Sequence, residues 1–254
     1  MMPSGLKKEF QNLKIKIVEK KYAGNNVTCS ICNSSYREFG IFGIKNRKNA
    51  RCHKCGSLER HRLIYKYLKE KNLLNKPLSI LHVAPERVFY EIFRKLQMVQ
   101  YFPCDLTPKK YNYLGGVKII KVDITNIPFE SNSFDFILCN HVLEHIPDDQ
   151  LAMSELFRVM KDNGFGIFQV PIDYSREKTY EDFSITTPAG REKAFGQYNH
   201  VRWYGRDYKD RLQNVGFQVI EDDYIDTFTA KEQFKYGFMS TEKIYYCKKN
   251  GRQL

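Results

Sequence analysis

The sequence predicts an α/β protein with a doubly wound, mainly parallel sheet, preceded by a small four-cysteine module. Two Cys-x2-Cys pairs lie near the N-terminus, and from residue 78 short apolar runs alternate with segments of helical periodicity. A length of 254 residues has room for one large domain and one small module. We therefore place the module at 1–56, a linking helix at 57–76 and the large domain at 77–254.

The composition excludes several classes of protein. Hydrophobic residues make up 42% and aromatic residues 14% of the chain, which is too apolar for a disordered protein. No apolar run reaches the roughly 20 residues that a membrane helix needs. The Lys-rich residues 1–21 lack the apolar segment of a secretory signal. We therefore expect a soluble, cytoplasmic protein.

The net charge of +12 is concentrated in the N-terminal third of the chain. Residues 1–76 contain 18 Lys and Arg against 5 Asp and Glu, a net charge of +13, whereas residues 77–254 contain 23 against 24. Such asymmetry is typical of a surface that binds nucleic acid or another acidic partner. A solvated lysine-rich surface explains it equally, so both interpretations stay open.

Four cysteines have the spacing of a zinc site. Two residues separate Cys29 from Cys32 and Cys52 from Cys55, and 19 residues lie between the two pairs. Two intervening residues let one tight turn direct both sulfurs at one ion, and a hairpin between the turns completes a tetrahedron. Two disulfides are the alternative, which a reducing compartment disfavours. We predict a zinc ribbon whose ion is structural, because four thiolates leave no coordination position open.

The elements that follow are predicted from periodicity and punctuation. A linking helix is expected after Gly56, with Leu63, Ile64, Tyr67 and Leu68 at helical spacing. From residue 78 on, apolar runs bounded by polar turns predict strands, and longer periodic segments predict helices. The expected strands are 78–83, 100–104, 117–122, 134–139, 166–170, 217–224 and 243–247, and the expected helices are 86–98, 148–160 and 208–215.

Carboxylates follow two successive strands of the predicted sheet. Asp105 closes the second strand about 22 residues after the first, where a carboxylate accepts hydrogen bonds from both hydroxyls of a ribose. Asp123 closes the third strand, where its carboxylate can accept from an exocyclic amine while the Ile124 amide donates to an adenine ring. Each Asp taken singly is also explained as a turn former. Both together, at successive strand ends, favour a ligand that contains adenosine.

Several motifs resemble those of a known family. Residues 122–162, which include DITNIPFESNSFDFILCNHVLEHIPD at 123–148, resemble the class I S-adenosylmethionine-dependent methyltransferases, and the resemblance extends over roughly 78–248. More narrowly, the chain resembles bacterial methyltransferases with an N-terminal zinc ribbon. The motifs shared with them are RCHKCGSLERH at 51–61, LHVAPE at 81–86, TYEDFSIT at 179–186 and FGQYNHVR at 195–202.

The resemblance implies a Rossmann-like methyltransferase fold of seven strands, the last one antiparallel, with S-adenosylmethionine as cofactor. The loop 82–86 departs from the family because it contains no glycine. S-adenosylmethionine has no phosphate to be approached by backbone amides, so the small Ala84 suffices there. The cofactor-binding residues expected on this basis are His82, Ala84, Glu86, Asp105, Leu106, Asp123, Ile124 and Asn140.

Methyl transfer from a sulfonium requires that the protein position a nucleophile, and a hydroxyl nucleophile also needs a base. His141 and His145 follow the fourth strand, and His200 lies in an insert at about 171–204 that is expected to roof the substrate pocket. Each histidine also has a structural explanation, in a cap, an ion pair or a lid. The candidate bases are, in order of preference, His145, His200 and His141.

The expected function is transfer of a methyl group from S-adenosylmethionine to a small-molecule or sugar acceptor, at oxygen. An RNA methyltransferase that holds RNA through residues 1–76 is the first alternative. A zinc-ribbon interaction module with an inactive methyltransferase domain is the second. The sequence names neither the acceptor nor the oligomeric state.

Overall fold

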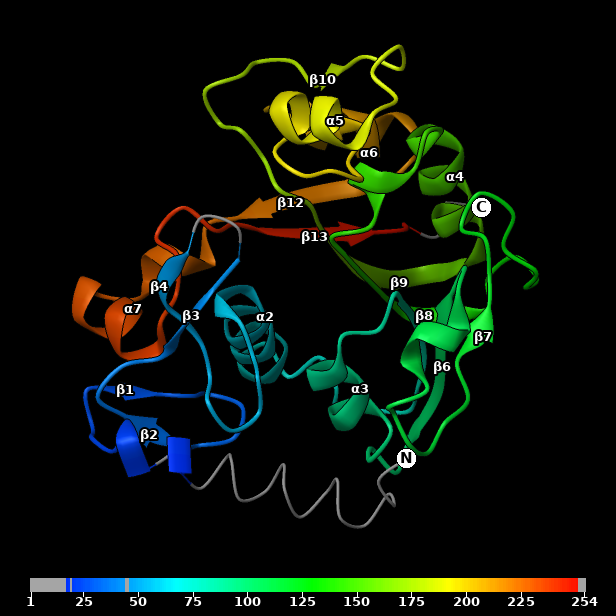
Figure 1. The fold of residues 1–254 in the computed structure, drawn as a ribbon. Helices are drawn as coiled ribbons and strands as arrows, with labels where there is room; N and C mark the ends of the chain where they lie inside the picture. Colours follow the sequence, from blue (N-terminus) through cyan, green and yellow to red (C-terminus); the bar gives the residue numbers. More distant parts are fainter. Residues whose placement is uncertain (1–16, 19, 44–45, 251–254) are drawn as a thin grey trace, which may run out of the picture. The chain divides into compact units, whose positions relative to one another are not determined.

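The computed structural model describes residues 17–18, 20–43 and 46–250, so part of the basic N-terminal segment lies outside the described residues (Figure 1). The chain divides into two compact units. The N-terminal unit runs to Asn75 and also includes Asp223–Lys243, and the sheet unit comprises Lys76–Asp222 and the chain from Ile244 onward. The return segment, Asp223–Lys243, lies inside the range that the sequence assigns to the large domain.

The sheet unit is built on seven strands in the order β12-β13-β9-β8-β5-β6-β7. All neighbouring pairs are parallel except those of β13, which runs antiparallel to both β9 and β12. The predicted seven-stranded, mainly parallel sheet with an antiparallel last strand is therefore confirmed. Its strands are β5 (Leu78–Val83), β6 (Val99–Asp105), β7 (Ile120–Lys121), β8 (Phe134–Asn140), β9 (Met160–Gln169), β12 (Gln218–Asp222) and β13 (Ile244–Lys248).

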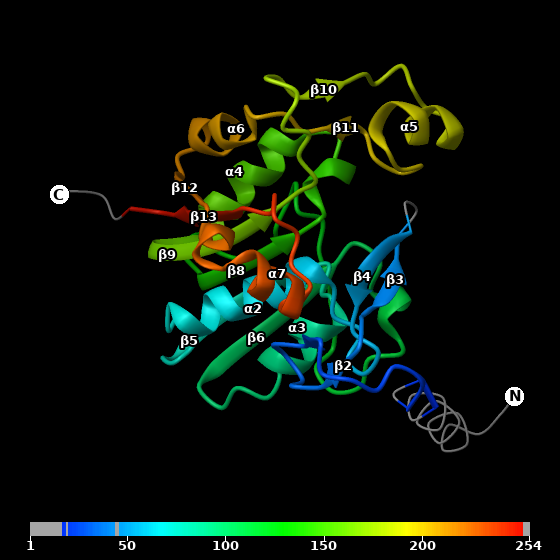
Figure 2. The same ribbon diagram turned by 90° about the vertical axis from the view of Figure 1, so that its left-hand side faces the viewer.

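Helices cover both faces of this sheet (Figure 2). Ile137 and Cys139 of β8 pack in one core with apolar residues of α4 (Asp149–Val159) and α6 (Tyr208–Asn214). On the other face, Phe93 of α3 (Arg87–Phe93) lies edge-on to Phe136 of β8, with the ring centroids 6.0 Å apart. Because successive side chains of a strand point to opposite faces, alternate β8 residues supply the two cores.

The bounds of several elements differ from the prediction: the linking helix placed at 57–76 is Glu59–Glu70, the strand expected at 217–224 is Gln218–Asp222, and the strand expected at 166–170 extends over Met160–Gln169. The helix expected at 86–98 ends at Phe93, where the chain turns before β6. The strand expected at 117–122 is reduced to Ile120–Lys121. This strand is the edge of the sheet and pairs with β6 through two residues, so little holds its neighbours in extended geometry.

The insert between β9 and α6 forms a small substructure within the sheet unit. Its strands β10 (Tyr180–Glu181) and β11 (Arg202–Trp203) pair antiparallel, and α5 (Pro188–Phe195) lies between them in the chain. Thr187 caps α5 by accepting a hydrogen bond from the Gly190 amide, as an N-cap threonine does.

Short hairpins and helical segments make up the described part of the N-terminal unit. One residue, Arg62, joins them: its guanidinium donates to the carbonyls of Ser57 at 2.8 Å, Tyr236 at 2.6 Å and Gly237 at 2.7 Å, and lies 4.2 Å from the Phe39 ring centroid. The elements are β1 (Val27–Thr28), β2 (Ser35–Tyr36), β3 (Gly40–Phe42), β4 (Arg47–Arg51), α2 (Glu59–Glu70), η3 (Tyr224–Thr227) and α7 (Ala230–Tyr236).

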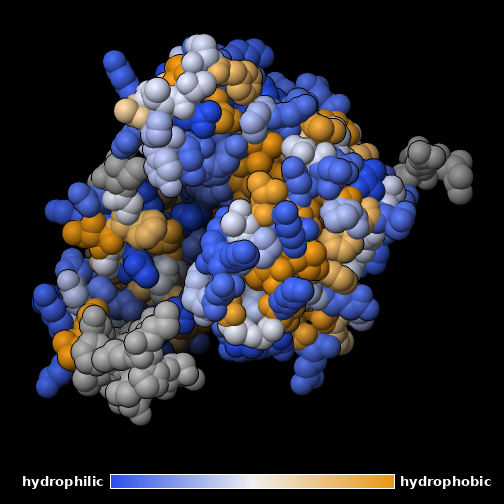
Figure 3. All heavy atoms as spheres, turned by 45° about the vertical axis from the view of Figure 1, so that its right-hand side comes forward, coloured by the Kyte–Doolittle hydropathy of each residue, from blue (hydrophilic) through white to orange (hydrophobic). Residues whose placement is uncertain are grey.

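The described part of the chain has no helix with the length and apolarity to cross a membrane. The face in Figure 3 is mixed in hydropathy, with hydrophilic side chains lying among scattered apolar ones.

Candidate active site and four-cysteine site

Three strand ends meet at one edge of the sheet. The register pairs Val83 of β5 with Cys104 of β6 and with Cys139 of β8. The residues that follow, Ala84, Asp105 and Asn140, therefore lie side by side at the carboxyl edge. Ligands of open α/β sheets bind at this edge.

The backbone is strained at two of these strand ends. Ala84 has φ +47° and His141, which follows Asn140, has φ +52°. Residues other than glycine rarely adopt this left-handed conformation, which costs of order 1 kcal/mol or more and is found mainly at functional sites.

Asp105 is buried, and its carboxylate accepts two hydrogen bonds and makes one ion pair. Oδ1 accepts from the Thr107 amide at 2.7 Å, and Oδ2 accepts from the Tyr111 hydroxyl at 2.8 Å and pairs with Lys110 Nζ at 2.9 Å. Leu106, the next residue, exposes 58% of its surface at the same edge.

Asp123 follows the predicted third strand and is exposed. Its Oδ1 accepts from both the amide and the hydroxyl of Thr125, at 2.9 and 2.7 Å. These two hydrogen bonds hold the pKa of Asp123 below its ordinary value. The Asp123 carboxylate therefore stabilises a turn, as one of its two sequence interpretations predicted. The Ile124 side chain beside it is buried.

His82 and Glu86 form a pair behind the first strand end. His82 is fully buried, with Nδ1 2.8 Å from the Tyr101 hydroxyl and Nε2 3.0 Å from Glu86 Oε2. Glu86 is the N-cap residue of α3, yet its side chain does not cap that helix. The ring of His82 therefore orients the Glu86 carboxylate, and any contact to a ligand falls to Glu86.

The hydrogen bonding of Asn140 shows whether the carboxyl edge fits a polar ligand. Its side chain is buried, and within the described structure neither Oδ1 nor Nδ2 has a hydrogen-bond partner. An unpartnered buried amide costs about 1–3 kcal/mol. Such an amide, beside Asp105 and the small Ala84, fits a polar cofactor whose groups complete its hydrogen bonds.

A buried carboxylate lies among the three predicted histidines. Glu144 belongs to η2 (Leu143–His145), and its side chain is 1% exposed. Its Oε1 lies 3.4 Å from His141 Nδ1 and 3.9 Å from both His145 Nε2 and His200 Nε2. The structure thus brings all three candidate bases around one oxygen.

Burial and charge oppose each other in this cluster. Burial raises the pKa of Glu144, but the His141 hydrogen bond and the neighbouring imidazoles outweigh it, so the pKa lies below its ordinary value. Burial lowers the pKa of His200, although the Glu144 charge partly compensates. The geometry therefore favours an ionised Glu144 beside a neutral His200.

Arg202 fixes the insert to the loop after β8. Its fully buried guanidinium donates to the carbonyls of Leu143 (3.0 Å), Ile146 and Pro147 (2.8 Å), and to Glu181 Oε2 at 2.8 Å. The position of His200, two residues earlier, is thereby tied to η2.

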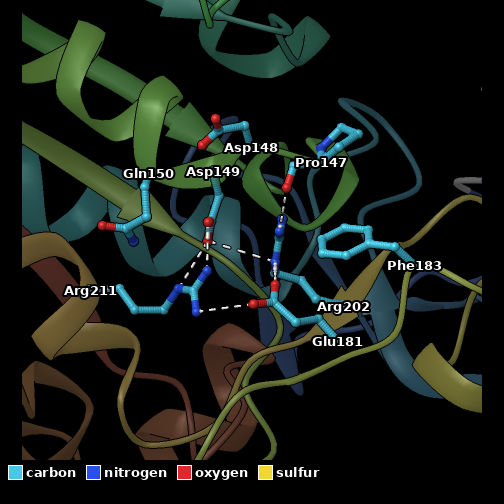
Figure 4. A pocket seen from close by; sticks show the side chains of 8 residues that line it. All are labelled: Pro147, Asp148, Asp149, Gln150, Glu181, Phe183, Arg202 and Arg211. Atoms are coloured by element: carbon cyan, nitrogen blue, oxygen red, sulfur yellow. Dashed lines mark hydrogen bonds and ion pairs between the residues drawn. The ribbon is translucent and has the colours of Figure 1, made fainter.

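A cavity of about 440 Å³ lies beside this clamp. Figure 4 shows Arg202 and Arg211 directed at Asp149 and Glu181, and Arg211 Nη2 lies 2.6 Å from Asp149 Oδ1. Phe183 and Pro147 supply apolar surface at the cavity. A polar small molecule of moderate size fits these dimensions. The lining residues are Pro147, Asp148, Asp149, Gln150, Glu181, Phe183, Arg202 and Arg211.

The four predicted zinc ligands converge in the N-terminal unit. Their sulfurs lie within 4.8 Å of one another, with Cys29 Sγ 3.6 Å from Cys55 Sγ and Cys32 Sγ 3.6 Å from Cys52 Sγ. Sulfurs at the corners of a tetrahedron with zinc–sulfur bonds of about 2.3 Å lie roughly 3.8 Å apart.

The two cysteine turns have the same geometry. The Asn33 amide donates to the Cys29 carbonyl at 2.9 Å, and the Gly56 amide donates to the Cys52 carbonyl at 3.0 Å. Asn33 and Gly56 both have positive φ, +56° and +74°, which glycine and asparagine tolerate best. These donors and the paired sulfurs fit a four-thiolate ion site.

Sequence reasoning did not include Glu144 or Arg202 among the site residues. The sequence places a carboxylate next to an imidazole at Glu144-His145, which could have indicated a site. The burial of Glu144 among three histidines, however, depends on the packing of the insert. Arg202 directly follows the motif histidine His200 and Val201, yet its four acceptors come from two distant segments.

Comparisons with known proteins agree with this geometry. Residues 89–168 match a methyltransferase-domain family. The chain is 29% identical over 111 residues to sterol 24-C-methyltransferase erg6 of Schizosaccharomyces pombe, covering 41% of this chain and 27% of that protein. It is 27% identical over 125 residues to demethylmenaquinone methyltransferase of a Geobacillus species, covering 44% and 53%. The chain thus spans between a quarter and about half of these relatives.

A solved structure shares the fold. It is the complex between the Haloferax volcanii Trm112 methyltransferase activator and the protein assigned as a methyltransferase, with 13% identity and a TM-score of 0.50, covering 76% of this chain and 94% of that chain. The strand order and this solved structure show a Rossmann-like methyltransferase fold, and residues 89–168 of that fold match a methyltransferase-domain family.

Proposed function

We propose that the chain binds S-adenosylmethionine at the carboxyl edge of the sheet and transfers its methyl group to an oxygen of a small-molecule or sugar acceptor. The observation that supports this most strongly is the cluster of Glu144 and three histidines directly after Asn140. It lies beside the strand ends at which ligands bind in such folds.

The chain offers complementary groups for the cofactor. Asp105 would accept from the ribose hydroxyls, and the Ile124 amide and Asp123 would bind the adenine, beside Leu106. Glu86, held by His82, would attract the methionine amine, and Ala84 leaves room in the loop. Asn140 would gain the hydrogen bonds that its buried amide lacks. When bound, the cofactor supplies an electrophilic methyl group on a sulfonium.

The acceptor side of the site is built to handle a proton. A hydroxyl acceptor loses its proton as it becomes a nucleophile, and a positioned base typically contributes 10²- to 10⁴-fold. His145 is the preferred base, with 26% of its side chain exposed, whereas the His200 side chain is 10% exposed. His200 and His141 would position the Glu144 carboxylate that stabilises the charged imidazole. The charged side chains that line the cavity, Arg202 and Arg211 among them, favour a hydroxyl-rich acceptor.

The N-terminal unit is proposed to hold one structural Zn²⁺ on Cys29, Cys32, Cys52 and Cys55. Four thiolates would close the coordination sphere, so this ion would stabilise the fold without touching an acceptor.

The test of the function is a two-part assay on the full chain. Calorimetry with S-adenosylhomocysteine measures cofactor binding. Incubation with S-adenosylmethionine carrying a deuterated methyl group, against panels of sugars, phenols, amines and RNA, identifies the acceptor by mass spectrometry. A folded protein that binds neither form of the cofactor would refute the proposal, and labelling of amines alone would refute the oxygen acceptor.

An RNA acceptor is the second candidate, and one observation favours it. Phe42 on the β3–β4 hairpin is exposed, and the guanidinium groups of Arg47 and Arg51 lie 6.0 and 5.9 Å from its ring centroid. Exposed aromatic rings flanked by arginines suit base stacking and phosphate contact. RNA binding that weakens steeply with salt, and that Phe42→Ala removes, would support this candidate.

A further inference from the structure

We infer that Glu144, His145 and His200 form a second metal site, which binds a divalent transition-metal ion such as Zn²⁺ through one carboxylate oxygen and two imidazole nitrogens. This site is separate from the four-cysteine site and belongs to the sheet unit. Its further consequence rests on the proposed function: the open position of the ion receives the hydroxyl oxygen of the acceptor, and the ion then takes the place of His145 by favouring loss of that hydroxyl's proton to solvent.

The hydrogen bonds of the two imidazoles determine which nitrogens are available. His145 Nδ1 lies 3.1 Å from the Asn199 carbonyl, and His200 Nδ1 lies 3.1 Å from the Phe195 carbonyl. A carbonyl only accepts, so both Nδ1 atoms carry hydrogen. In a neutral ring with its hydrogen on Nδ1, the Nε2 atom carries a lone pair. Histidine metal ligands whose other nitrogen donates to a carbonyl have the same arrangement.

These lone pairs face a carboxylate oxygen. Each Nε2 lies 3.9 Å from Glu144 Oε1, and the two rings are packed edge to face with centroids 4.8 Å apart. Two nitrogen lone pairs held this close to an anionic oxygen repel it unless a cation lies between them.

The carboxylate is weakly satisfied for a buried group. The side chain is 1% exposed, the shortest contact of Oε1 is the 3.4 Å pair with His141 Nδ1, and within the described structure Oε2 has no hydrogen-bond partner. An ionised carboxylate taken out of water with its oxygens poorly partnered costs several kcal/mol. A bound cation satisfies the carboxylate and both imidazoles at once.

The spacing fits one ion after a small contraction. The three ligand atoms lie within 4.8 Å of one another, and ligands of a first-row ion with bonds of about 2.0–2.2 Å lie roughly 3.0–3.4 Å apart. Two imidazoles and one carboxylate suit Zn²⁺, Co²⁺ or Fe²⁺ better than Mg²⁺ or Ca²⁺. Three protein ligands leave a position open, and the His145 side chain is 26% exposed.

The ligands are held by a rigid support. The Val201 amide donates to the Glu144 carbonyl at 2.9 Å, and Arg202 joins the same segment to Leu143, Ile146 and Pro147. His200 is therefore positioned against η2 before any ion binds, which lowers the cost of assembling the site.

The experiment measures metal stoichiometry on the full chain. The protein is equilibrated with Zn²⁺, and zinc is counted by elemental analysis and native mass spectrometry. We expect two equivalents of zinc in the wild type and one in Glu144→Gln. Loss of this ligand should weaken the zinc affinity of the second site roughly 100-fold or more, because removal of a residue that only hydrogen-bonds a metal ligand already costs about 10–100-fold. The matched control is His141→Asn, which removes an imidazole near the same oxygen, keeps a residue that tolerates positive φ, and should retain two equivalents.

Cobalt titration gives an independent readout. Co²⁺ in this site should show the weak visible bands of nitrogen and oxygen ligands, without the thiolate charge-transfer bands of the four-cysteine site, and His145→Asn should abolish them. A wild type that takes up only one equivalent, or a Glu144→Gln protein that keeps two, would overturn the inference. Calorimetry with S-adenosylhomocysteine on the same samples reports separately on the proposed function, so the two can fail independently.

Discussion

Replacement of Asp105 by alanine tests where the cofactor binds. The carboxylate offers about four lone-pair sites, and Thr107, Tyr111 and Lys110 use three of them. One site is therefore open for a ribose hydroxyl. The Lys110 contact can give way to a second hydroxyl at a cost of about 0–1 kcal/mol, because the lysine side chain is 55% exposed.

The magnitude follows from this count of acceptor sites. The hydrogen bond that fills the open acceptor site is made to a charged group, contributes about 1.5–3 kcal/mol, and by itself sets the minimum loss of binding free energy. Asp105→Ala should thus weaken binding of S-adenosylhomocysteine roughly 10- to 150-fold. Calorimetry measures this change, and circular dichroism verifies the fold.

Lys110→Ala is the matched control for this prediction. It removes the competitor and leaves the carboxylate, so affinity should stay within about threefold of the wild type or become tighter. A folded Asp105→Ala protein with wild-type affinity would refute the reasoning. So would a Lys110→Ala protein that loses as much affinity as Asp105→Ala.

The other predictions concern the clamp, the zinc site and one acid-sensitive contact. Arg202→Met should lower kcat at least about tenfold while S-adenosylhomocysteine still binds, because it frees the insert from η2; unchanged turnover in steady-state kinetics would contradict it. Cys52→Ser should remove one zinc and unfold the N-terminal unit, as followed by elemental analysis and limited proteolysis; an unaltered cleavage pattern would count against a structural ion. Asp135 accepts from Ser79 and from Lys161 Nζ at 2.8 Å; burial opposes these contacts, but they leave the pKa of Asp135 below its ordinary value. A lowered pKa stabilises the fold above the unfolded-state pKa of about 3.9, so the stability gap between the wild type and Asp135→Asn should be constant near neutrality and shrink as the pH falls below about 4; a gap in urea unfolding that widens there would reverse the sign.

Local sequence signals predicted the parts of the fold that local physics decides. The run Leu78–Val83 is apolar throughout and buried on both faces, and it forms β5 with the predicted bounds. The cysteine turns follow from two-residue spacing and the conformational freedom of Asn33 and Gly56. Ala84, Asp105 and Asn140 meet at one edge because parallel strands end together, which strand order alone implies.

Signals that depend on distant packing were absent from the sequence. Glu144 stands out as a site residue because His200, from another segment of the chain, lies beside it. Arg202 holds that segment against the loop of Glu144. The segment 223–243 shows no local feature that assigns it to the N-terminal unit, because its anchor is Arg62, 174 residues away from Tyr236. Neither contact produces a periodic pattern or a characteristic residue spacing in the sequence, so neither could be predicted from it.

The return of residues 223–243 to the N-terminal unit affects how the protein is made. Arg62 and Phe39 are synthesised before residues 76–222, whereas the Tyr236 and Gly237 carbonyls that Arg62 contacts leave the ribosome after them. Until then the guanidinium group of Arg62 lacks two of its three carbonyl acceptors. Translation of the N-terminal unit therefore starts before residues 76–222 of the sheet unit and ends after them. A truncation that stops before residue 237, or a gene fusion that moves residues 1–75 elsewhere, would separate Arg62 from these acceptors.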